Sequence, residues 1–429
     1  MQTRLSLIFI CTALLFACSK KNENASPVVV RDSIVRESVK EEISKVNALP
    51  VPDTAALKKH SVLIRLLSGD TFTLSLPEGF QIRIAAEGMK RIRFMDRSPD
   101  GRLFLTDMHN LADNSNGKIW ILEEADSLQR FSKITKYLDR LRNPNSIAFH
   151  TDKQRKKWLY VALTDKLVRY AYQDGDIDPQ SSPETLDTWP DYGLSYRYGG
   201  WHLIRTIQFN NEGRLYVSVG SSCNTCIEKE EVRASVIVMD EDGKNRRVFA
   251  RGLRNAVGMT LAEGNLYATN MAADHLGVDK PDDALFRIDD KGHYGWPWCY
   301  HWQGRVYQDA RYDTVPDRVR ASDVKEAVSY LGAHTAPLGV EWFGQSEASD
   351  PALQNYFLVA QHGSYSASIG RGYSLQRVRE KHAPEDFITG FLDDKNIIHG
   401  RPCGILPAGV DRFYFTDDKN GVLYYVYKD

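Results

Sequence analysis

The sequence predicts an all-β protein, a six-bladed β-propeller, and two observations carry that prediction. First, a short phrase recurs: a turn residue, then Leu or Tyr, an aromatic, an aliphatic, and a small or acidic residue. Its copies cover residues 101–107, 158–161, 213–217, 264–268, 355–359 and 411–417. Second, the aromatic markers of these phrases are separated by 56, 56, 51, 90 and 57 residues. Strand-forming phrases at such even spacing are typical of propeller blades.

A second apolar run follows each phrase, as a blade of several strands requires. These runs cover residues 118–122, 167–170, 236–239, 285–288, 373–378 and 422–426. The segment 80–86 is expected to add a strand to the last blade and so close the ring. The long fourth gap predicts a loop inserted between blades, over one face. Stacked irregular sandwiches are the alternative fold.

The first residues follow a different pattern. Arg4 precedes an apolar run over residues 5–16, which is too short to span a bilayer comfortably. The run ends in Leu-Phe-Ala-Cys, which resembles a bacterial lipobox, so residues 1–17 are expected to be a signal peptide and Cys18 the lipidated residue. Cleavage of an ordinary secretory signal is the alternative. A lipid anchor would tie the protein to the membrane of the bacterial cell envelope, and Ser19 is compatible with the outer membrane.

Residues 18–60 are polar and charged, with prolines, and predict a tether. The propeller is then expected to cover residues 61–429. The 429-residue chain has a net charge of −1 and no basic, aromatic-interleaved patch, which argues against nucleic-acid binding. It also lacks the common nucleotide-binding and hydrolase motifs, so nicotinamide and nucleotide chemistry are not expected.

Cysteine spacing leaves several pairings open. Cys223 and Cys226 form a CxxC without a second CxxC or nearby histidines, which is poor evidence for zinc. They are expected to form a small loop disulfide, two free thiols or a redox-active dithiol. Cys299 and Cys403 are a further possible pair.

Polar residues at the ends of the phrases are the candidate functional residues, because a propeller would gather them around its central channel. The organising stretch runs over residues 198–226 and contains His202, three residues before Arg205. Arg254, Asn255 and Arg401 occupy similar places, as does the loop 270–274. His109 and His275 are competing bases. By themselves these residues also fit structural roles: a buried histidine, an inter-blade ion pair and a turn cap.

Six segments in order resemble the glucose/sorbosone dehydrogenase family, with L-sorbosone dehydrogenases the most similar members. The segments cover residues 198–226, 252–258, 292–297, 334–340, 361–364 and 400–402. The resemblance extends from about residue 76 to the C-terminus. It implies a six-bladed propeller that binds pyrroloquinoline quinone (PQQ) and Ca²⁺ and oxidises a sugar or a sugar-derived aldehyde.

The resemblance also implies residue roles. His202 matches the base that removes the substrate proton, a role that suits imidazole. Arg254 and Asn255 match the pair that contacts quinone and substrate, and Arg401 matches a ligand of a cofactor carboxylate. Ca²⁺ would take the backbone carbonyls of Ala272 and Ala273, because oxygen ligands suit a hard cation.

Three positions depart from the family pattern: Met271, Ala284 and Ala367 replace polar or charged residues. In the enzyme interpretation Arg205 or Arg371 must then face the channel and contact the cofactor. The alternative is a non-redox propeller that has lost PQQ and binds a carbohydrate or a protein; a propeller lactonase has little support. The resemblance does not identify the sugar or the electron acceptor.

Overall fold

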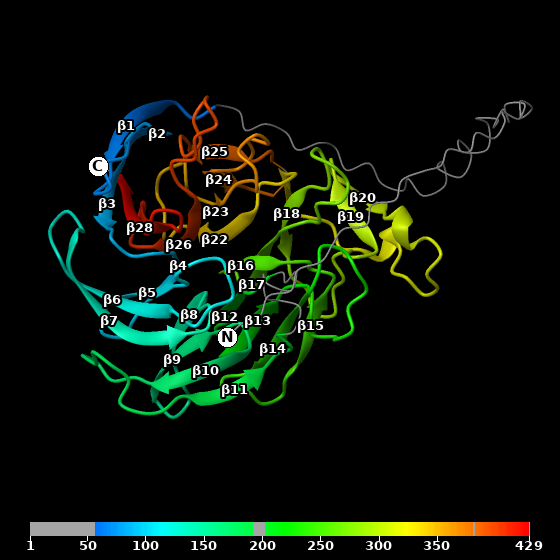
Figure 1. Ribbon diagram of the computed structural model, residues 1–429, viewed down its shortest axis with the longest axis horizontal. Coiled ribbons are helices and arrows are strands. Elements are labelled where there is room, and N and C mark those ends of the chain that lie inside the picture. The colour runs from blue at the N-terminus through cyan, green and yellow to red at the C-terminus, as the bar shows by residue number, and fades with distance from the viewer. Residues whose placement is uncertain (1–55, 192–201, 381, 429) are drawn as a thin grey trace, which may run out of the picture. The chain divides into compact units, whose positions relative to one another are not determined.

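The computed structural model describes residues 56–191, 202–380 and 382–428. These residues form six four-stranded antiparallel sheets arranged as a ring (Figure 1), which confirms the predicted six-bladed propeller. The innermost strands contact one another in sequence around the ring, and the last contacts the first. The expected signal peptide, Cys18 and most of the tether lie outside the described residues. No helix among the described residues has the length and apolar character needed to cross a membrane.

In each blade the strands follow one another outward from the innermost strand. The first three blades are β4 (Ile92–Arg97), β5 (Leu103–Asp107), β6 (Gly117–Ala125) and β7 (Phe131–Leu141); β8 (Ser146–Thr151), β9 (Lys157–Ala162), β10 (Lys166–Ala171) and β11 (Glu184–Thr188); and β12 (Arg205–Phe209), β13 (Arg214–Val219), β14 (Ser235–Asp240) and β15 (Arg247–Arg251). The last three are β16 (Ala256–Ala262), β17 (Asn265–Asn270), β18 (Asp283–Arg287) and β21 (Ser329–Gly332); β22 (Pro337–Phe343), β23 (Tyr356–Gln361), β24 (Ser374–Val378) and β25 (Glu385–Ile388); and β26 (Pro402–Pro407), β27 (Arg412–Asp417), β28 (Val422–Lys428) and β3 (Phe80–Ala86). The six phrases are the second strands.

The ring closes as predicted. β3 pairs antiparallel with β28, with Ala86 opposite Leu423 and Phe80 opposite Lys428. A strand from the start of the propeller therefore completes the blade built from its end. This pairing completes the four-stranded sheet of the sixth blade and closes the ring.

An unpredicted hairpin precedes the ring. β1 (Lys59–Arg65) and β2 (Thr71–Pro77) pair with each other, and Ser75 bridges to Thr389 beside the fifth blade. The expected tether boundary after residue 60 therefore falls inside β1. At Gly390 an added Cβ would lie 2.3 Å from Thr73 O, so the hairpin packs directly on backbone there.

The long fourth gap lies within a blade, so its predicted place between blades was wrong. It separates β18 from β21 and contains β19 (Cys299–Trp302), β20 (Arg305–Gln308), η2 (Ala310–Tyr312) and η3 (Ala321–Asp323). The outermost strand β21 is only four residues long, too short for its pattern to be recognised in the sequence.

The aromatic markers of the phrases build the core between blades. Phe104 packs edge-on against Phe149 of the next blade at a centroid distance of 4.9 Å. Tyr160 lies 4.9 Å from Phe209 in the same way. The repeated aromatic therefore joins each sheet to its neighbour, because edge-to-face packing adds to the area buried.

Glycines allow the innermost strands to meet backbone to backbone. An added Cβ would lie 2.1 Å from Leu338 O at Gly258, 2.3 Å from Cys403 O at Gly339, and 2.4 Å from Arg93 O at Gly404. Each glycine lies at a register shift of its strand. Threonines of the second strands reinforce the same contacts: Thr269 Oγ1 donates to Leu338 O, and Thr416 Oγ1 donates to Arg93 O.

Gly339→Ala is expected to lower the free energy of unfolding by about 1–3 kcal/mol, the usual effect of overpacking. The added methyl group must displace the backbone of the sixth blade, since no flexible side chain is there to move. Urea unfolding of the two proteins measures the difference. An unchanged midpoint and slope would mean that the inner strands are not packed this closely.

Glu341 makes stability depend on pH. It lies between the fourth and fifth blades, where Thr260 Oγ1 donates to Oε2 at 2.9 Å, and burial raises the pKa of its carboxyl to about 8. The folded state thus keeps a proton that the unfolded state loses above about pH 4.5. Stability from this proton is present at pH 4 and falls as the pH rises towards 8. Glu341→Gln is therefore expected to raise the melting temperature at pH 8–9 relative to wild type, with the difference vanishing near pH 4–5 in a calorimetric pH series.

Candidate functional site

All described residues assigned a role in the sequence lie at one end of the ring. In each blade the chain enters the first strand and leaves the second strand at this end, which we call the site face. His202, Arg254, Asn255 and Arg401 precede first strands, Arg205 begins one, and Ala272 and Ala273 follow a second strand. Tyr198 to Trp201 of the organising stretch lie outside the described residues.

An apolar layer fills the middle of the ring beneath the site face. Its members come mostly from the innermost strands of different blades: Val257, Leu338, Cys403, Phe94, Ile204 and Met271. Because these strands surround the axis, a ligand on this face would rest on an apolar surface with polar groups around it.

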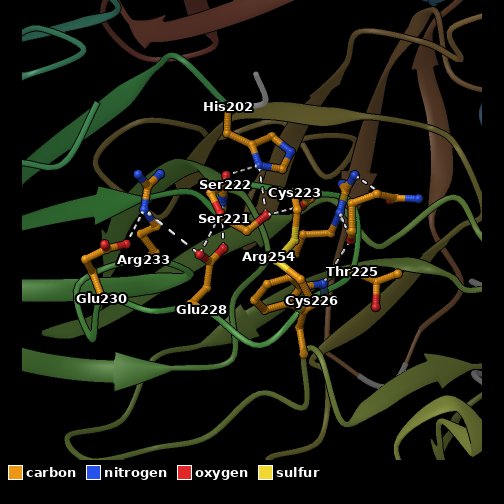
Figure 2. The surroundings of a disulfide bond; sticks show 12 residues. His202, Ser221, Ser222, Cys223, Thr225, Cys226, Glu228, Glu230, Arg233 and Arg254 are labelled. Atoms are coloured by element: carbon orange, nitrogen blue, oxygen red, sulfur yellow. Dashed lines mark hydrogen bonds and ion pairs between the residues drawn. A yellow bond between two sulfur atoms is a disulfide. The ribbon is translucent and has the colours of Figure 1, made fainter. Parts of the chain in front are cut away.

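His202 is held in one tautomer (Figure 2). Its Nδ1 lies 2.9 Å from Ser221 O and 3.0 Å from Ser221 Oγ, whose own proton goes to Cys223 O. Nδ1 therefore carries the proton, and Nε2 carries the lone pair that a general base needs. Gly220 makes room for the ring: a Cβ there would lie 2.6 Å from His202 Cβ and 2.7 Å from Asn255 Oδ1.

The His202 imidazole is neutral at physiological pH. Burial lowers its pKa well below 6.5, and the nearby guanidinium of Arg254 lowers it further. The hydrogen bond to Ser221 acts in the opposite direction. A neutral imidazole with its proton on Nδ1 is the form able to accept a proton from a substrate hydroxyl.

The Arg254 side chain is buried, and protein acceptors surround its guanidinium. Nε donates to Asn224 O and Nη2 to Asn224 Oδ1, both at 2.9 Å. Nη1 donates to Ala272 O at 2.8 Å, and Nη2 lies 3.3 Å from Asp274. The Ala272 carbonyl expected to bind Ca²⁺ thus already contacts a cation.

Asn255 reaches the site face beside Met271. Its backbone N–H donates to Asn270 Oδ1 at 3.0 Å, and its side-chain Nδ2 contacts Met271 Sδ at 3.3 Å. Ala284 is buried in the core, and its neighbour Asp283 is buried beside it. Asp283 accepts from the N–H groups of Ala272 at 2.7 Å and Ala336 at 2.8 Å, and burial raises its pKa to about 6.

Arg401 is partly exposed and organises the loop after β23. Nη1 donates to His362 O at 3.0 Å and Gly363 O at 2.9 Å, and Nη2 donates to Ser364 O at 3.0 Å. Its own N–H is fixed by Asp417 Oδ1 at 2.8 Å. This is the turn-capping geometry that the sequence left open, and the exposed side of the guanidinium remains accessible to solvent.

Arg205 does not occupy the position we expected. Its side chain has 0% exposure, so it cannot contact a cofactor on the site face as predicted. Nη1 instead donates to His202 O at 2.8 Å and Ile204 O at 2.7 Å. As the first residue of β12 it points between blades, towards Trp189, and it supports the backbone that carries His202. Arg371, the other proposed replacement, pairs with Asp279 at 2.6 Å.

Sequence reasoning missed a charged cluster around Asp418. This fully buried carboxylate pairs with Arg91 at 3.0 Å, with Arg93, and with His362 Nε2 at 2.8 Å. Although burial opposes its ionisation, His362 and the two arginines hold its pKa well below the ordinary value. The available signals were the Arg-Ile-Arg at the start of the first strand and the aspartate directly after the last phrase.

The same cluster links Arg401 to His202 around the ring. His362 Nδ1 lies 3.4 Å from Arg401 Nη1. On the other side Arg93 Nε donates to Asn145 Oδ1 at 3.0 Å, and Asn145 Nδ2 donates to Arg205 O at 3.2 Å. The structure therefore brings His202, Arg254 and Arg401 to one face, as the proposed chemistry requires.

Two open questions of the sequence are answered here. Cys223 and Cys226 form a disulfide with a Cα–Cα distance of 6.2 Å, whereas Cys299 and Cys403 are buried and make no disulfide in the described chain. Of the competing bases, His275 is bonded through Nε2 to Asp309 of the insertion at 2.7 Å. The insertion thus reaches the site face beside Arg254.

Comparison with known proteins assigns this chain to a family. The model of the TrAA12-like family matches residues 74–429. The chain belongs to the TrAA12-like family. Kinship with L-sorbosone dehydrogenases in particular stays a prediction.

Three solved structures share the fold of this TrAA12-like chain. The holo form of the pyranose dehydrogenase PQQ domain from Coprinopsis cinerea has a TM-score of 0.66 at 17% identity, over 83% of this chain and 97% of that one. A calcium structure of Trichoderma reesei carbohydrate-active enzyme family AA12 has a TM-score of 0.67 at 16% identity, over 82% and 96%. The PQQ-bound aldose sugar dehydrogenase from Streptomyces coelicolor has a TM-score of 0.56 at 16% identity, over 82% and 100%.

Proposed function

We propose that this protein is a PQQ-dependent dehydrogenase that oxidises a sugar or a sugar-derived aldehyde on the site face. The observation that carries the proposal is the state of His202, a neutral imidazole with its proton on Nδ1, beside Arg254 and Asn255. Membership of the TrAA12-like family supports it, as do the PQQ-containing structures that share the fold.

The residues present fit the cofactor. PQQ carries carboxylates on a flat ring system, and the site face offers both cations and an apolar layer. Arg91 and Arg93 pair with Asp418, and the backbone N–H of Arg401 donates to Asp417; the side chains of Arg91 and Arg401 are partly exposed. Arg91 and Arg401 would hold the carboxylates, and the carbonyls near Ala272 and Ala273 would hold Ca²⁺.

When bound, PQQ supplies the quinone that accepts the hydride. The chain supplies the base that accepts the substrate proton and the residues that position this base. His202 Nε2 accepts the proton of the substrate hydroxyl, and Ser221 O accepts the Nδ1 hydrogen bond of the imidazolium that results. Burial, together with the charge of Arg254, keeps His202 neutral beforehand, and Gly220 allows His202 and Asn255 to lie side by side.

One observation favours the alternative of a non-redox propeller that binds a carbohydrate or a protein. The Ala272 carbonyl is already occupied by Arg254, which competes with Ca²⁺ for that oxygen. A lactonase is not favoured: among described residues, the three-membered group of metal-ligating side chains is Cys223, Cys226 and Glu228, not an acidic cage.

The test is reconstitution of the full chain with PQQ, with and without Ca²⁺. We expect saturable PQQ binding by equilibrium dialysis and reduction of an electron-accepting dye with a panel of aldoses and aldehydes. Arg401→Gln is expected to weaken PQQ binding by about tenfold or more, as loss of one charge-assisted hydrogen bond implies. Absence of both binding and dye reduction would reject the enzyme, and sugar binding without PQQ would then support the alternative.

We also propose that the protein is held at the cell envelope by a lipid on Cys18. The apolar run and lipobox-like sequence support this. In a bacterial host, fatty-acid labelling is expected for the wild type and is expected to disappear in Cys18→Ala. Equal labelling of both proteins would refute the anchor.

A further inference from the structure

The disulfide loop after β13 lies between His202 and Arg254 (Figure 2). Cys223 and Cys226 enclose only Asn224 and Thr225, and both cysteines are partly exposed. Their bond packs beside Ala234, Ala273 and Trp296. A small thiol reagent can therefore reach the bond, although the loop is part of the site.

Asn224 connects three elements through four accepted hydrogen bonds. Its backbone O accepts from Arg254 Nε at 2.9 Å and from Trp296 Nε1 of the insertion at 3.1 Å. Its side-chain Oδ1 accepts from Arg254 Nη2 at 2.9 Å and from the N–H of Asp274 at 3.0 Å. Asn224 thus accepts hydrogen bonds from two nitrogens of Arg254, and this fixes the plane of the guanidinium.

The other end of the loop is anchored without the disulfide. Glu228 accepts from Ser222 N at 2.6 Å and from Ser222 Oγ at 2.7 Å. Ser221, which accepts the hydrogen bond from His202, is itself held by the fourth blade, because its N–H donates to Arg254 O at 2.8 Å. Breaking the disulfide would therefore release Asn224 and Thr225 first, and leave Ser221 in place.

We propose that Asn224 is a positioning residue that acts through Arg254, and that the Cys223–Cys226 bond holds it there, so that thiol reduction disorganises the site. Reduction consumes two electrons and two protons from a dithiol such as dithiothreitol, which becomes a cyclic disulfide while the protein gains two thiols. The expected change in kcat rests on the proposed function. The expected displacement of Arg254 does not.

The displacement of Arg254 is measured through the pKa of the His202 imidazole. The charged groups acting on this imidazole are Arg254, from the start of the fourth blade, and Arg205 on its own strand. If Asn224 is released, Arg254 can move away, and the pKa of His202 rises towards 6.5. A change confined to overall stability would not move that titration.

The experiment compares four proteins, each full length: wild type, Asn224→Ala, the double variant Cys223→Ser/Cys226→Ser and Thr225→Val. His202 is titrated by NMR with labelled histidine, its signal among 11 histidines being assigned by its loss in His202→Gln. Thr225→Val is the matched control, since Thr225 contacts Tyr312 and not Arg254.

We expect the His202 pKa to rise in reduced wild type, in Asn224→Ala and in the double variant, the last being insensitive to dithiothreitol. Thr225→Val leaves the bonds between Asn224 and Arg254 in place and is expected to retain the wild-type titration. In the PQQ-loaded double variant, which lacks the disulfide without any added reductant, kcat should fall by up to about 10²-fold relative to wild type, the scale of a displaced positioning group.

The outcomes separate the two proposals. Two new thiols with an unchanged His202 titration and unchanged kcat would overturn the positioning role and leave the enzyme proposal standing. A moved titration in a protein that neither binds PQQ nor turns over sugar would support the positioning role and reject the enzyme.

Discussion

Replacing His202 with alanine is expected to lower kcat by about 10²–10⁴-fold, the range that general-base catalysis contributes. In the proposed function the imidazole Nε2 is the proton acceptor next to Arg254 and Asn255, and the hydrogen bond that Nδ1 donates to Ser221 O fixes that tautomer. Removing the ring removes the acceptor. The free energy of unfolding should change by only about 1 kcal/mol, because the hydrogen bond to Ser221 joins neutral groups at a partly exposed position.

Steady-state dye reduction and thermal unfolding, measured on the same preparations, check this expectation. His275→Ala is the control, since that histidine is bonded to Asp309 rather than turned to the His202 group. The low pKa of His202 also predicts that the wild-type kcat stays constant as the pH falls past 6.5. It is expected to decline only when the pH approaches the lowered pKa of the imidazole. A His202→Ala protein with normal kcat, or with a large loss of stability, would make the residue structural.

Asp418→Ala is expected to lower the free energy of unfolding by about 3–5 kcal/mol, the usual effect of leaving buried charges uncompensated. Arg93 is almost fully buried and loses its ion pair, while Arg91 and His362 lose theirs at the edge of the site face. Because His362 contacts Arg401, PQQ binding should weaken as well.

Chemical denaturation at pH 7 measures the loss, with Asp393→Ala as the control. Asp393 pairs with His399 at 3.3 Å in a more exposed position, where an ion pair contributes about 0–1 kcal/mol. Equal effects of the two substitutions would show that the Asp418 cluster does not hold the sixth blade to the first.

The even spacing of the phrases was enough to predict six blades and the closing strand, because each blade repeats the same apolar pattern. It could not locate β21, whose four residues carry too little pattern, or β1 and β2, which belong to no blade. His202, Arg254, Asn255 and Arg401 were found through ordered motifs. Asp418 and Arg93 were not, since 325 residues separate two groups that meet only when the ring closes.

The amino-acid sequence by itself determined the architecture and the chemical types available at the phrase ends, because strand period, turn residues and side-chain chemistry are local properties. Only the tertiary structure decided which of those groups act together. Arg205 and Arg254 look alike in the sequence. Arg205 is buried between blades and donates to His202 O, whereas Arg254 donates to Asn224 on the site face. The difference lies in strand alternation and in contacts between distant segments, which determine where a side chain points and whether its charge reaches a ligand.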